Sequence, residues 1–340
     1  MAQDTAHAEQ GMNLSTITQM NFSMAASRIL MTAVQLGIFS HIAAGKTSVL
    51  EIAPEVESSE RGTGMLLNAL CAFQLLVKKD GRFGLHPVAR QYLVRESPDY
   101  MGYMFESNDM WDAWGQLTEV VRAGRPVQQV QRGERAEEFF SVLVRSLHVM
   151  NREPARRLAQ VMGAGANRKG MRVLDVACGS GVWGIALAEA DPETRVTFQD
   201  FPGVLKVTAD YLNRHRLTGK HDFLPGNLEH VDFGDSQFDL TVLGNICHSE
   251  GERASRDLFS RVHRALRRGG RIAIVETVPN DDRTGAIFPL IFALNMLLHT
   301  PDGGTYTLRE YTGWLKEAGY GGIETAEIGL NSPLIIASKD

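Results

Sequence analysis

The stretch Val173–Gly184, which reads Val-Leu-Asp-Val-Ala-Cys-Gly-Ser-Gly-Val-Trp-Gly, constrains the fold of this chain more than any other. Its first residues predict a buried strand, the small residues that follow predict a tight turn, and a helix is expected from Val182. Gly179 and Gly181 let the backbone approach a bound molecule, because no Cβ stands in the way. A helix start beside that turn also leaves N–H groups free, so the stretch predicts a ligand-binding strand–turn–helix unit.

Two cofactor chemistries fit this turn. Gly179, Gly181 and Gly184 match the dinucleotide pattern G-x-G-x-x-G, and the same glycines with Asp175 match D-x-x-x-G-x-G, the pattern of an S-adenosylmethionine (SAM) loop. A carboxylate just ahead of the turn would repel a pyrophosphate, whereas it attracts the sulfonium and α-ammonium groups of SAM. The pattern therefore favours SAM, while NAD and a unit without any ligand stay open as alternatives.

Length, charge and cysteine content narrow the class of protein. A chain of 340 residues is long enough for two domains, and its net charge of -5 argues against general binding to nucleic acid or to an anionic membrane. The scattered Cys71, Cys178 and Cys247 form neither a disulfide framework nor a zinc spacing, so we expect no metal and a cytoplasmic protein. The N-terminus lacks the apolar core of a signal peptide, and the apolar stretch 287–298 is too short to span a bilayer.

The N-terminal part has the element order of a winged helix. Helices are predicted over residues 23–44, 49–53 and 59–76, followed by a hairpin over 77–85 with an Asp-Gly turn. A DNA-binding winged helix needs a recognition helix with several basic or amide side chains, but 59–76 offers only Arg61, Asn68 and Gln74 on a largely apolar helix. Packing against another protein chain is therefore favoured over DNA binding, and we expect a homodimer.

The C-terminal part alternates strands and helices. Strands are predicted over 173–176, 195–199, 221–224, 238–243, 271–276, 323–328 and 334–338, and helices over 203–215, 254–266, 287–298 and 308–318. This alternation predicts an α/β Rossmann-like fold, with a parallel sheet covered by helices on both faces. A glycine- and alanine-rich linker over 163–167 places the domain boundary, giving a mostly helical domain over 1–165 and the sheet domain over 166–340.

Polar residues at the predicted strand ends suit a nucleoside, because ligands of such sheets bind beyond the carboxyl ends of the strands. Asp200 follows the second strand, where a carboxylate can accept both ribose hydroxyls of NAD or SAM. Asn227 and Leu228 follow the third strand, where the amide can bond an adenine edge while the leucine packs on its face; an ordinary turn is the alternative. Phe201 and Asn245, which follow the second and fourth strands, complete the predicted cofactor site.

His248 and Glu276 are the candidate catalytic pair. His248 follows the fourth strand and Glu276 closes the next one, so both are expected at the ligand edge and near each other. A neutral imidazole is well suited to accept a proton near pH 7, and a carboxylate on one ring nitrogen leaves the other free as the base. Ordinary ion pairing is the alternative for this pair.

With these residues the chain resembles the SAM-dependent O-methyltransferases of the plant caffeic-acid type and their bacterial relatives acting on polyketides, phenazines and carotenoids. The resemblance covers nearly the whole chain: a winged-helix dimerisation domain over 23–93, the SAM loop over 175–181, the ribose carboxylate at Asp200 and the Ile-Cys-His run ending at His248. It implies SAM as the methyl donor, S-adenosylhomocysteine (SAH) as the product, and a homodimer. It also implies that His248 is the catalytic base, that a second catalytic residue falls on Glu276, and that a small aromatic or polyketide-like hydroxyl is methylated.

The chain departs from the family pattern at several positions. The first loop glycine is Ala177, the adenine-side Asp is Asn227, a family Lys is Gly244, and a second family Glu is Thr305. The family run H-D-W-x-D reads His-Ser-Glu-Gly-Glu from His248. SAM binding survives these changes. Methylation of carbon or of a carboxylate, which needs no base, stays open, as does a metabolite-sensing DNA-binding regulator.

A group of mainly apolar and aromatic side chains is the candidate acceptor pocket. Its members are Met110, Trp111, Trp114, Phe288, Phe292, Asn295, Met296 and His299. Such a wall suits a flat, apolar, hydroxylated small molecule, and an ordinary protein core is the alternative.

Overall fold

The computed structural model describes residues 13–126, 134–219 and 221–340, which form two compact units, Met1–Asn108 and Asp109–Asp340. Helices between residues 109 and 161 pack within the second unit, and the predicted functional boundary at residue 165 remains a prediction. In the described part of the chain, no helix is long and apolar enough to cross a membrane.

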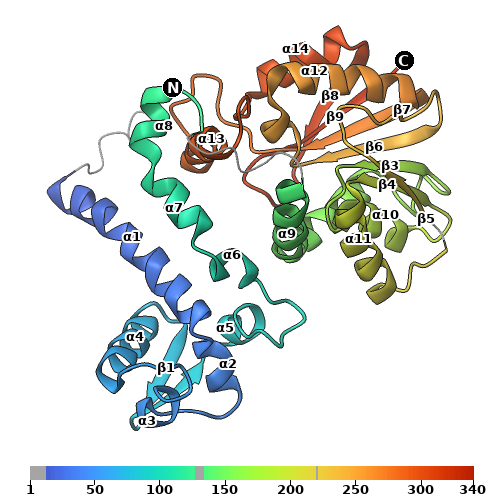
Figure 1. Cartoon of the computed structure of the whole chain (residues 1–340). Helices are drawn as coiled ribbons and strands as arrows, with labels where there is room; N and C mark the ends of the chain where they lie inside the picture. The colour runs from blue at the N-terminus through green and yellow to red at the C-terminus, as the bar shows by residue number, and fades with distance from the viewer. Residues whose placement is uncertain (1–12, 127–133, 220) are drawn as a thin grey trace, which may run out of the picture. The chain divides into compact units, whose positions relative to one another are not determined.

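The first unit confirms the order helix, helix, hairpin. Its elements are α1 (Leu14–Gln35), α2 (Ile38–Ala43), α3 (Val49–Ile52), α4 (Glu60–Ala72), β1 (Leu76–Lys79), β2 (Arg82–Leu85), α5 (Pro87–Tyr92) and α6 (Tyr103–Glu106) (Figure 1). The single helix predicted over 23–44 is divided at Gly37, whose φ of 65° is left-handed and ends α1. Asp80 and Gly81 have φ values of 51° and 76°, the two positive values of the expected hairpin turn.

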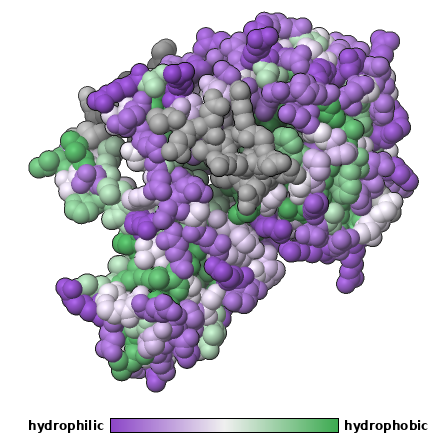
Figure 2. Space-filling model, in the orientation of Figure 1, coloured by the Kyte–Doolittle hydropathy of each residue, from purple (hydrophilic) through white to green (hydrophobic). Residues whose placement is uncertain are grey.

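The N-terminal half of α1 carries an apolar surface that the described residues leave open. The core of this unit begins further along the helix, with the buried Ala33 and Val34, and continues through α2 and α4. The exposed apolar side chains of α1 are Leu14, Ile17, Met20, Phe22 and Met24. Figure 2 shows this hydrophobic surface in green at the left edge, where Figure 1 draws the start of α1.

The second unit is built on a seven-stranded sheet with the order β5-β4-β3-β6-β7-β9-β8. Its strands are β3 (Arg172–Val176), β4 (Arg195–Asp200), β5 (His221–Pro225), β6 (Phe238–Gly244), β7 (Leu266–Val275), β8 (Tyr320–Ala326) and β9 (Leu334–Lys339). Adjacent strands from β5 through β7 are parallel, as predicted, but β9 runs antiparallel to both of its neighbours. The connection between β8 and β9 is too short for the crossover that a parallel pair requires.

Helices cover both faces of this sheet, so the predicted α/β architecture is confirmed. The helices are α7 (Asp109–Gly115), α8 (Leu117–Ala123), α9 (Glu134–Val161), α10 (Val182–Ala190), α11 (Pro202–Arg214), α12 (Cys247–Ala265), α13 (Ile287–His299) and α14 (Leu308–Glu317). Val173 packs with residues of α9, α10 and α11, whereas Leu174 points to the opposite face and packs with residues of α12 and α14. Figure 1 shows α9, α10 and α11 on one side of the sheet and α12 and α14 on the other. Strand order reverses beside β3, so a ligand is expected to bind at the carboxyl ends of β3 and β6.

Candidate active site

The turn after β3 requires its two glycines. Gly179 and Gly181 have φ values of 58° and 75°, and Gly181 is the N-cap of α10. A Cβ on Gly181 would lie 2.7 Å from Cγ2 of Thr208, and a Cβ on Gly179 would lie 3.0 Å from Cγ1 of Val144. Ala177, where the family has a glycine, adopts a left-handed φ of 49° despite its side chain. The turn therefore lies so close to its neighbours that side chains at these two positions would collide with them.

Side chains from three other elements hold this turn. The backbone N–H of Gly179 donates to Oδ2 of Asp200 at 2.8 Å, and Oγ1 of Thr208 donates to the Gly179 carbonyl at 2.7 Å. His148 of α9 is buried, and its Nδ1 lies 3.0 Å from Oγ of Ser180. The His148 ring is also stacked on Tyr211, with ring centroids 3.8 Å apart. Of these partners, the sequence indicated only Asp200.

Asp175 lies beneath the turn and is completely buried. Its Oδ2 accepts a hydrogen bond from the Gly184 N–H at 2.9 Å, whereas Oδ1 has no partner among the described residues. Burial, reinforced by the nearby negative charge of Asp200, raises the pKa of Asp175 to about 8. A buried acid with an unsatisfied oxygen beside the turn fits a positively charged ligand, because the cation would offset the cost of ionising it.

Gln199 connects two of the loops at the sheet edge, and the sequence analysis missed it. Its Oε1 accepts from the Ala177 N–H at 3.1 Å, and its Nε2 donates to the Gly226 carbonyl at 2.9 Å. The side chain is buried, so these bonds satisfy an amide that would otherwise be costly. The available signal was an amide directly before Asp200, in a strand whose Val196 and Phe198 are apolar.

The remaining predicted nucleoside residues follow strands β4, β5 and β6. Oδ1 of Asn227 accepts from the Glu229 N–H at 2.9 Å, the ordinary turn bond of such a residue. Leu228 is buried in the core on the α12 face, and Phe201 packs partly buried on the opposite face. Asn245 has a left-handed φ of 60°, and its N–H donates to the Val275 carbonyl at 2.9 Å. Contacts between these residues and a ligand remain predictions.

His248 and Glu276 meet as predicted. Nδ1 of His248 lies 2.8 Å from Oε2 of Glu276, and the His248 backbone N–H donates to Oε1 at 3.3 Å. Both residues are buried, with 8% and 3% of their surfaces exposed. Because a carboxylate only accepts, this bond places the proton on Nδ1 and leaves the lone pair on Nε2.

Helix α13 brings predicted acceptor residues to this pair. The Phe292 ring meets the His248 ring edge-on, with centroids 4.9 Å apart, and Phe288 stacks on Phe292 at 5.8 Å. Met296 and His299 are buried further along the same helix, and Nδ1 of His299 donates to the Asn295 carbonyl at 2.8 Å. The aromatic face of α13 thus begins at the imidazole and continues to Phe288, which is exposed.

Helices α7 and α8 pack against α13, so the two predicted halves of the acceptor wall belong to one region. Trp111 and Trp114 are partly buried on α7, while Met110 is exposed. Their contact with an acceptor remains a prediction.

A loop after α13 crosses the start of α12 and contacts the candidate base. The Gly304 N–H donates to the His248 carbonyl at 2.9 Å, and Oγ1 of Thr300 accepts from the Gly303 N–H at 2.9 Å. Thr305 is buried, and its hydroxyl donates to the Pro289 carbonyl at 3.2 Å. Thr305, at the position of a family Glu, thus ties this loop to α13 through a neutral hydrogen bond.

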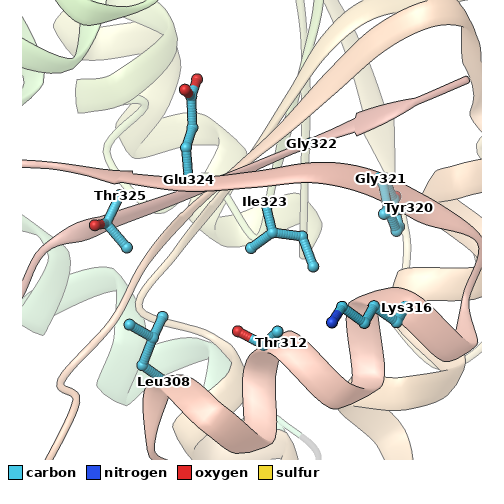
Figure 3. A pocket seen from close by; sticks show the side chains of 9 residues that line it. All are labelled: Leu308, Thr312, Lys316, Tyr320, Gly321, Gly322, Ile323, Glu324 and Thr325. Carbon is cyan, nitrogen blue, oxygen red and sulfur yellow. The ribbon is translucent and has the colours of Figure 1, made fainter.

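A separate groove of about 360 Å³ lies between α14 and β8. In Figure 3, Leu308, Thr312 and Lys316 line it from the helix, Ile323 points toward the helix, and Glu324 points away. None of its lining residues belongs to the predicted site. Within the described ranges, no group of three or more His, Cys, Asp or Glu side chains could hold a metal ion.

Comparison with known proteins identifies the family of this chain. A family model described as an O-methyltransferase domain matches residues 131–321, and one described as an O-methyltransferase dimerisation domain matches residues 18–95. The chain belongs to the O-methyltransferase family. This O-methyltransferase is 30% identical over 319 residues to 3-hydroxy-5-methyl-1-naphthoate 3-O-methyltransferase of Streptomyces sahachiroi, covering 91% of its own length and 90% of the relative.

Other relatives agree with this assignment. The tetracenomycin polyketide synthesis 8-O-methyl transferase TcmO of Streptomyces glaucescens is 27% identical over 336 residues, with 95% and 96% of the two chains covered. Two solved structures share the fold of this O-methyltransferase. The structure of PigF with SAH matches with a TM-score of 0.83 at 22% identity, and the match covers 97% of this chain and 100% of PigF. Human N-acetylserotonin methyltransferase with SAM has a TM-score of 0.80 at 21% identity, covering 97% and 99%.

Proposed function

We propose that this O-methyltransferase uses SAM to methylate a hydroxyl group of a small aromatic or polyketide-type molecule, with His248 as the general base. The observation that carries the proposal is the buried His248–Glu276 pair, in which Nδ1 of the imidazole lies 2.8 Å from Oε2 of the carboxylate. With Nδ1 bonded to the carboxylate, Nε2 keeps the lone pair that a base needs. The names of the naphthoate and tetracenomycin relatives support a fused aromatic or polyketide acceptor.

The residues around the glycine turn fit SAM. Asp175 has one unsatisfied oxygen that suits a cation, and Asp200 lies against the turn, where its carboxylate can also accept ribose hydroxyls. Gln199 and Thr208 hold the glycine turn through their bonds to Ala177 and Gly179, so the site is largely formed before the ligand arrives. When bound, SAM supplies an electrophilic methyl group.

His248 and Glu276 divide the proton chemistry between them. Nε2 of His248 accepts the proton of the acceptor hydroxyl, which makes the oxygen a better nucleophile. Glu276 orients the imidazole through its bond to Nδ1, holds the residue through the bond from the His248 backbone N–H, and offsets the positive charge that the ring gains. Phe292 covers one edge of the ring and helps to exclude water from it.

The acceptor pocket is assigned to α7 and α13. Phe288 and Phe292 form a stacked pair leading to the imidazole, and the buried Met296 and His299 lie further along α13. Aromatic walls of this kind bind flat molecules by stacking, while a few polar groups set their orientation. Trp111 and Trp114 of α7 are proposed as the facing wall.

A methyl-transfer screen tests the proposed function. Purified protein is incubated with SAM and either hydroxynaphthoates and polyketide phenols or matched acids that lack the hydroxyl, and products are identified by mass and fragmentation. We expect methyl ethers from the hydroxylated set alone. Methyl esters from the matched acids would instead establish carboxyl methylation, and products methylated at carbon would contradict the assignment of oxygen.

We also propose that the protein forms a homodimer through its first unit. The dimerisation-domain match covers residues 18–95, and the exposed apolar residues of α1 need a cover that the described residues do not provide. Phe22 is 65% exposed, so Phe22→Glu should weaken association without disturbing a core. Light scattering should show a dimer for the wild type and a smaller species for the variant; a wild-type monomer at micromolar concentration would contradict the proposal.

A further inference from the structure

Trp183 presents an N–H group that the described protein does not use. It is the second residue of α10, directly after the glycine turn, and its surface is only 3% exposed. No hydrogen bond joins Nε1 to any described residue, and Nε1 is not completely buried. The N–H therefore keeps a small opening to its surroundings. A buried indole normally gives its N–H to a partner, so a partner is missing here.

Gly244 explains where this N–H lies. It is the last residue of β6, and a Cβ on it would lie 2.2 Å from Nε1 and 2.6 Å from Cδ1 of Trp183. The φ of Gly244 is not positive, so glycine is required here because a side chain has no room and not because of the backbone conformation. The nitrogen edge of the indole thus occupies the place of any side chain at position 244, where the family carries a lysine.

This place is the carboxyl edge of the sheet at the point where strand order reverses. β6 pairs with β3, which leads into the glycine turn, and His248 follows β6 by one short loop. The indole nitrogen edge therefore lies at the carboxyl end of β6, at the sheet edge where the site proposed for SAM is expected. The carboxylate of Asp200 beside this turn accepts hydrogen bonds and repels an anion, so a donor such as the Trp183 N–H suits the anionic end of a ligand.

We propose that Trp183 is a further cofactor-binding residue, whose indole N–H donates a hydrogen bond to the α-carboxylate of the methyl donor. The inference rests on the proposed use of SAM and assigns a contact within that site. Indole is a donor only, and of the groups that SAM offers, the carboxylate is the strongest acceptor. Trp183 with Gly244 thus replaces a charged lysine by a neutral, rigid donor.

Calorimetry on Trp183→Phe tests the contact, because phenylalanine keeps an aromatic ring and removes the N–H. Two ligands are compared: SAH, and 5′-methylthioadenosine, which keeps the nucleoside and thioether but has no carboxylate. We expect the variant to bind SAH roughly tenfold to a hundredfold more weakly, the effect of a hydrogen bond to a charged group, and to bind 5′-methylthioadenosine nearly as the wild type does. Trp314→Phe, at a buried tryptophan of α14, is the matched control and should change neither affinity.

Each outcome decides the question. Unchanged SAH affinity in Trp183→Phe, or equal losses for both ligands, would overturn the proposal in favour of a packing role. A wild type that binds neither ligand would instead overturn the use of SAM itself. If Trp183→Phe does not fold, the four tryptophans of the wild type give separate indole N–H signals in NMR spectra. One should move downfield with SAH and much less with 5′-methylthioadenosine; four signals that respond alike to both ligands would contradict the carboxylate contact.

Discussion

Glu276 binds His248 at two places, the ring and the backbone. Oε2 lies 2.8 Å from Nδ1 and Oε1 lies 3.3 Å from the backbone nitrogen, so one carboxylate fixes both the position of the residue and the orientation of its ring. The Thr277 N–H donates to Oε2 as well, at 3.2 Å, and holds the carboxylate in turn. A base prepared in this way loses little orientational freedom when the acceptor arrives.

Removal of the imidazole should abolish most turnover. We expect His248→Ala to lower kcat by about 10²–10⁴, the usual contribution of a positioned base, and to leave SAH affinity near that of the wild type. Glu276→Gln should cost less, because an amide oxygen still accepts from Nδ1 but no longer offsets the ring's charge. Steady-state kinetics and calorimetry measure both quantities, with the exposed His230→Ala as control. Near-full turnover of His248→Ala would disprove the base assignment.

Asp175 should make the stability of the unliganded protein depend on pH. Its pKa is about 8 in the folded state, above the ordinary value of about 3.9 for an unfolded chain. Between these values the folded state holds a proton that the unfolded state has lost. The stability that comes from keeping Asp175 protonated is therefore fully present below about pH 4 and is lost as the pH rises to about 8. Over that range the free energy of unfolding falls by up to about 1.4 kcal/mol per pH unit.

Asp175→Asn removes this dependence, because the amide does not titrate. Denaturant unfolding at pH 5 and pH 8 should show the variant gaining stability relative to the wild type at the higher pH. Asp222→Asn, at an exposed position, is the matched control and should leave the difference between the two pH values unchanged. Parallel pH profiles for wild type and Asp175→Asn would show that the buried carboxyl does not hold a proton.

The sequence predicted those features that depend on local pattern. The turn of Gly179 and Gly181 was readable because strand, small residues and helix follow one another directly. The meeting of His248 and Glu276 was readable because both follow strands of one sheet, whose carboxyl ends share an edge. The antiparallel direction of β9 could not be predicted, because it depends on the short connection from β8 rather than on the residues of β9 itself.

Contacts that depend on packing between distant elements were not predictable. His148 reaches Ser180 only because α9 packs on α10, and helical periodicity gives the face of α9 but not its register along the sheet. The fit of Trp183 over Gly244 likewise depends on how α10 is set on β6. A glycine at the end of a strand is compatible with a close approach, but it does not identify the side chain that approaches.

The loop over the base should tolerate no side chain at Gly303. A Cβ there would lie 2.2 Å from Oγ1 of Thr300 and 2.4 Å from the His248 carbonyl oxygen, so Gly303→Ala must displace the loop or the base. We expect kcat to fall by about tenfold or more, as a small displacement from productive geometry does, with SAH affinity little changed. Gly313→Ala in α14, where nothing lies within 4 Å, is the matched control and should keep full activity. Equal kinetics for the two variants would show that the loop does not position His248.

The bond between His148 and Ser180 should act on the cofactor and not on the acceptor. His148→Phe can keep an aromatic ring over Tyr211 while it loses the hydrogen bond to Ser180, which lies between the two glycines of the turn. We expect the variant to weaken SAH binding by about 0.5–1.5 kcal/mol, the net contribution of one hydrogen bond, with kcat at saturating SAM nearly unchanged.

A double-mutant cycle separates this bond from the other interactions of His148. Ser180→Ala should weaken SAH binding by a similar amount, and the double variant should be hardly worse than either single one, because the two substitutions remove the same contact. Calorimetry with SAH gives the affinities, and thermal unfolding of all four proteins shows whether stability changes in the same way. If the losses of affinity simply add, or if kcat falls while affinity holds, the bond does not position the turn for the cofactor.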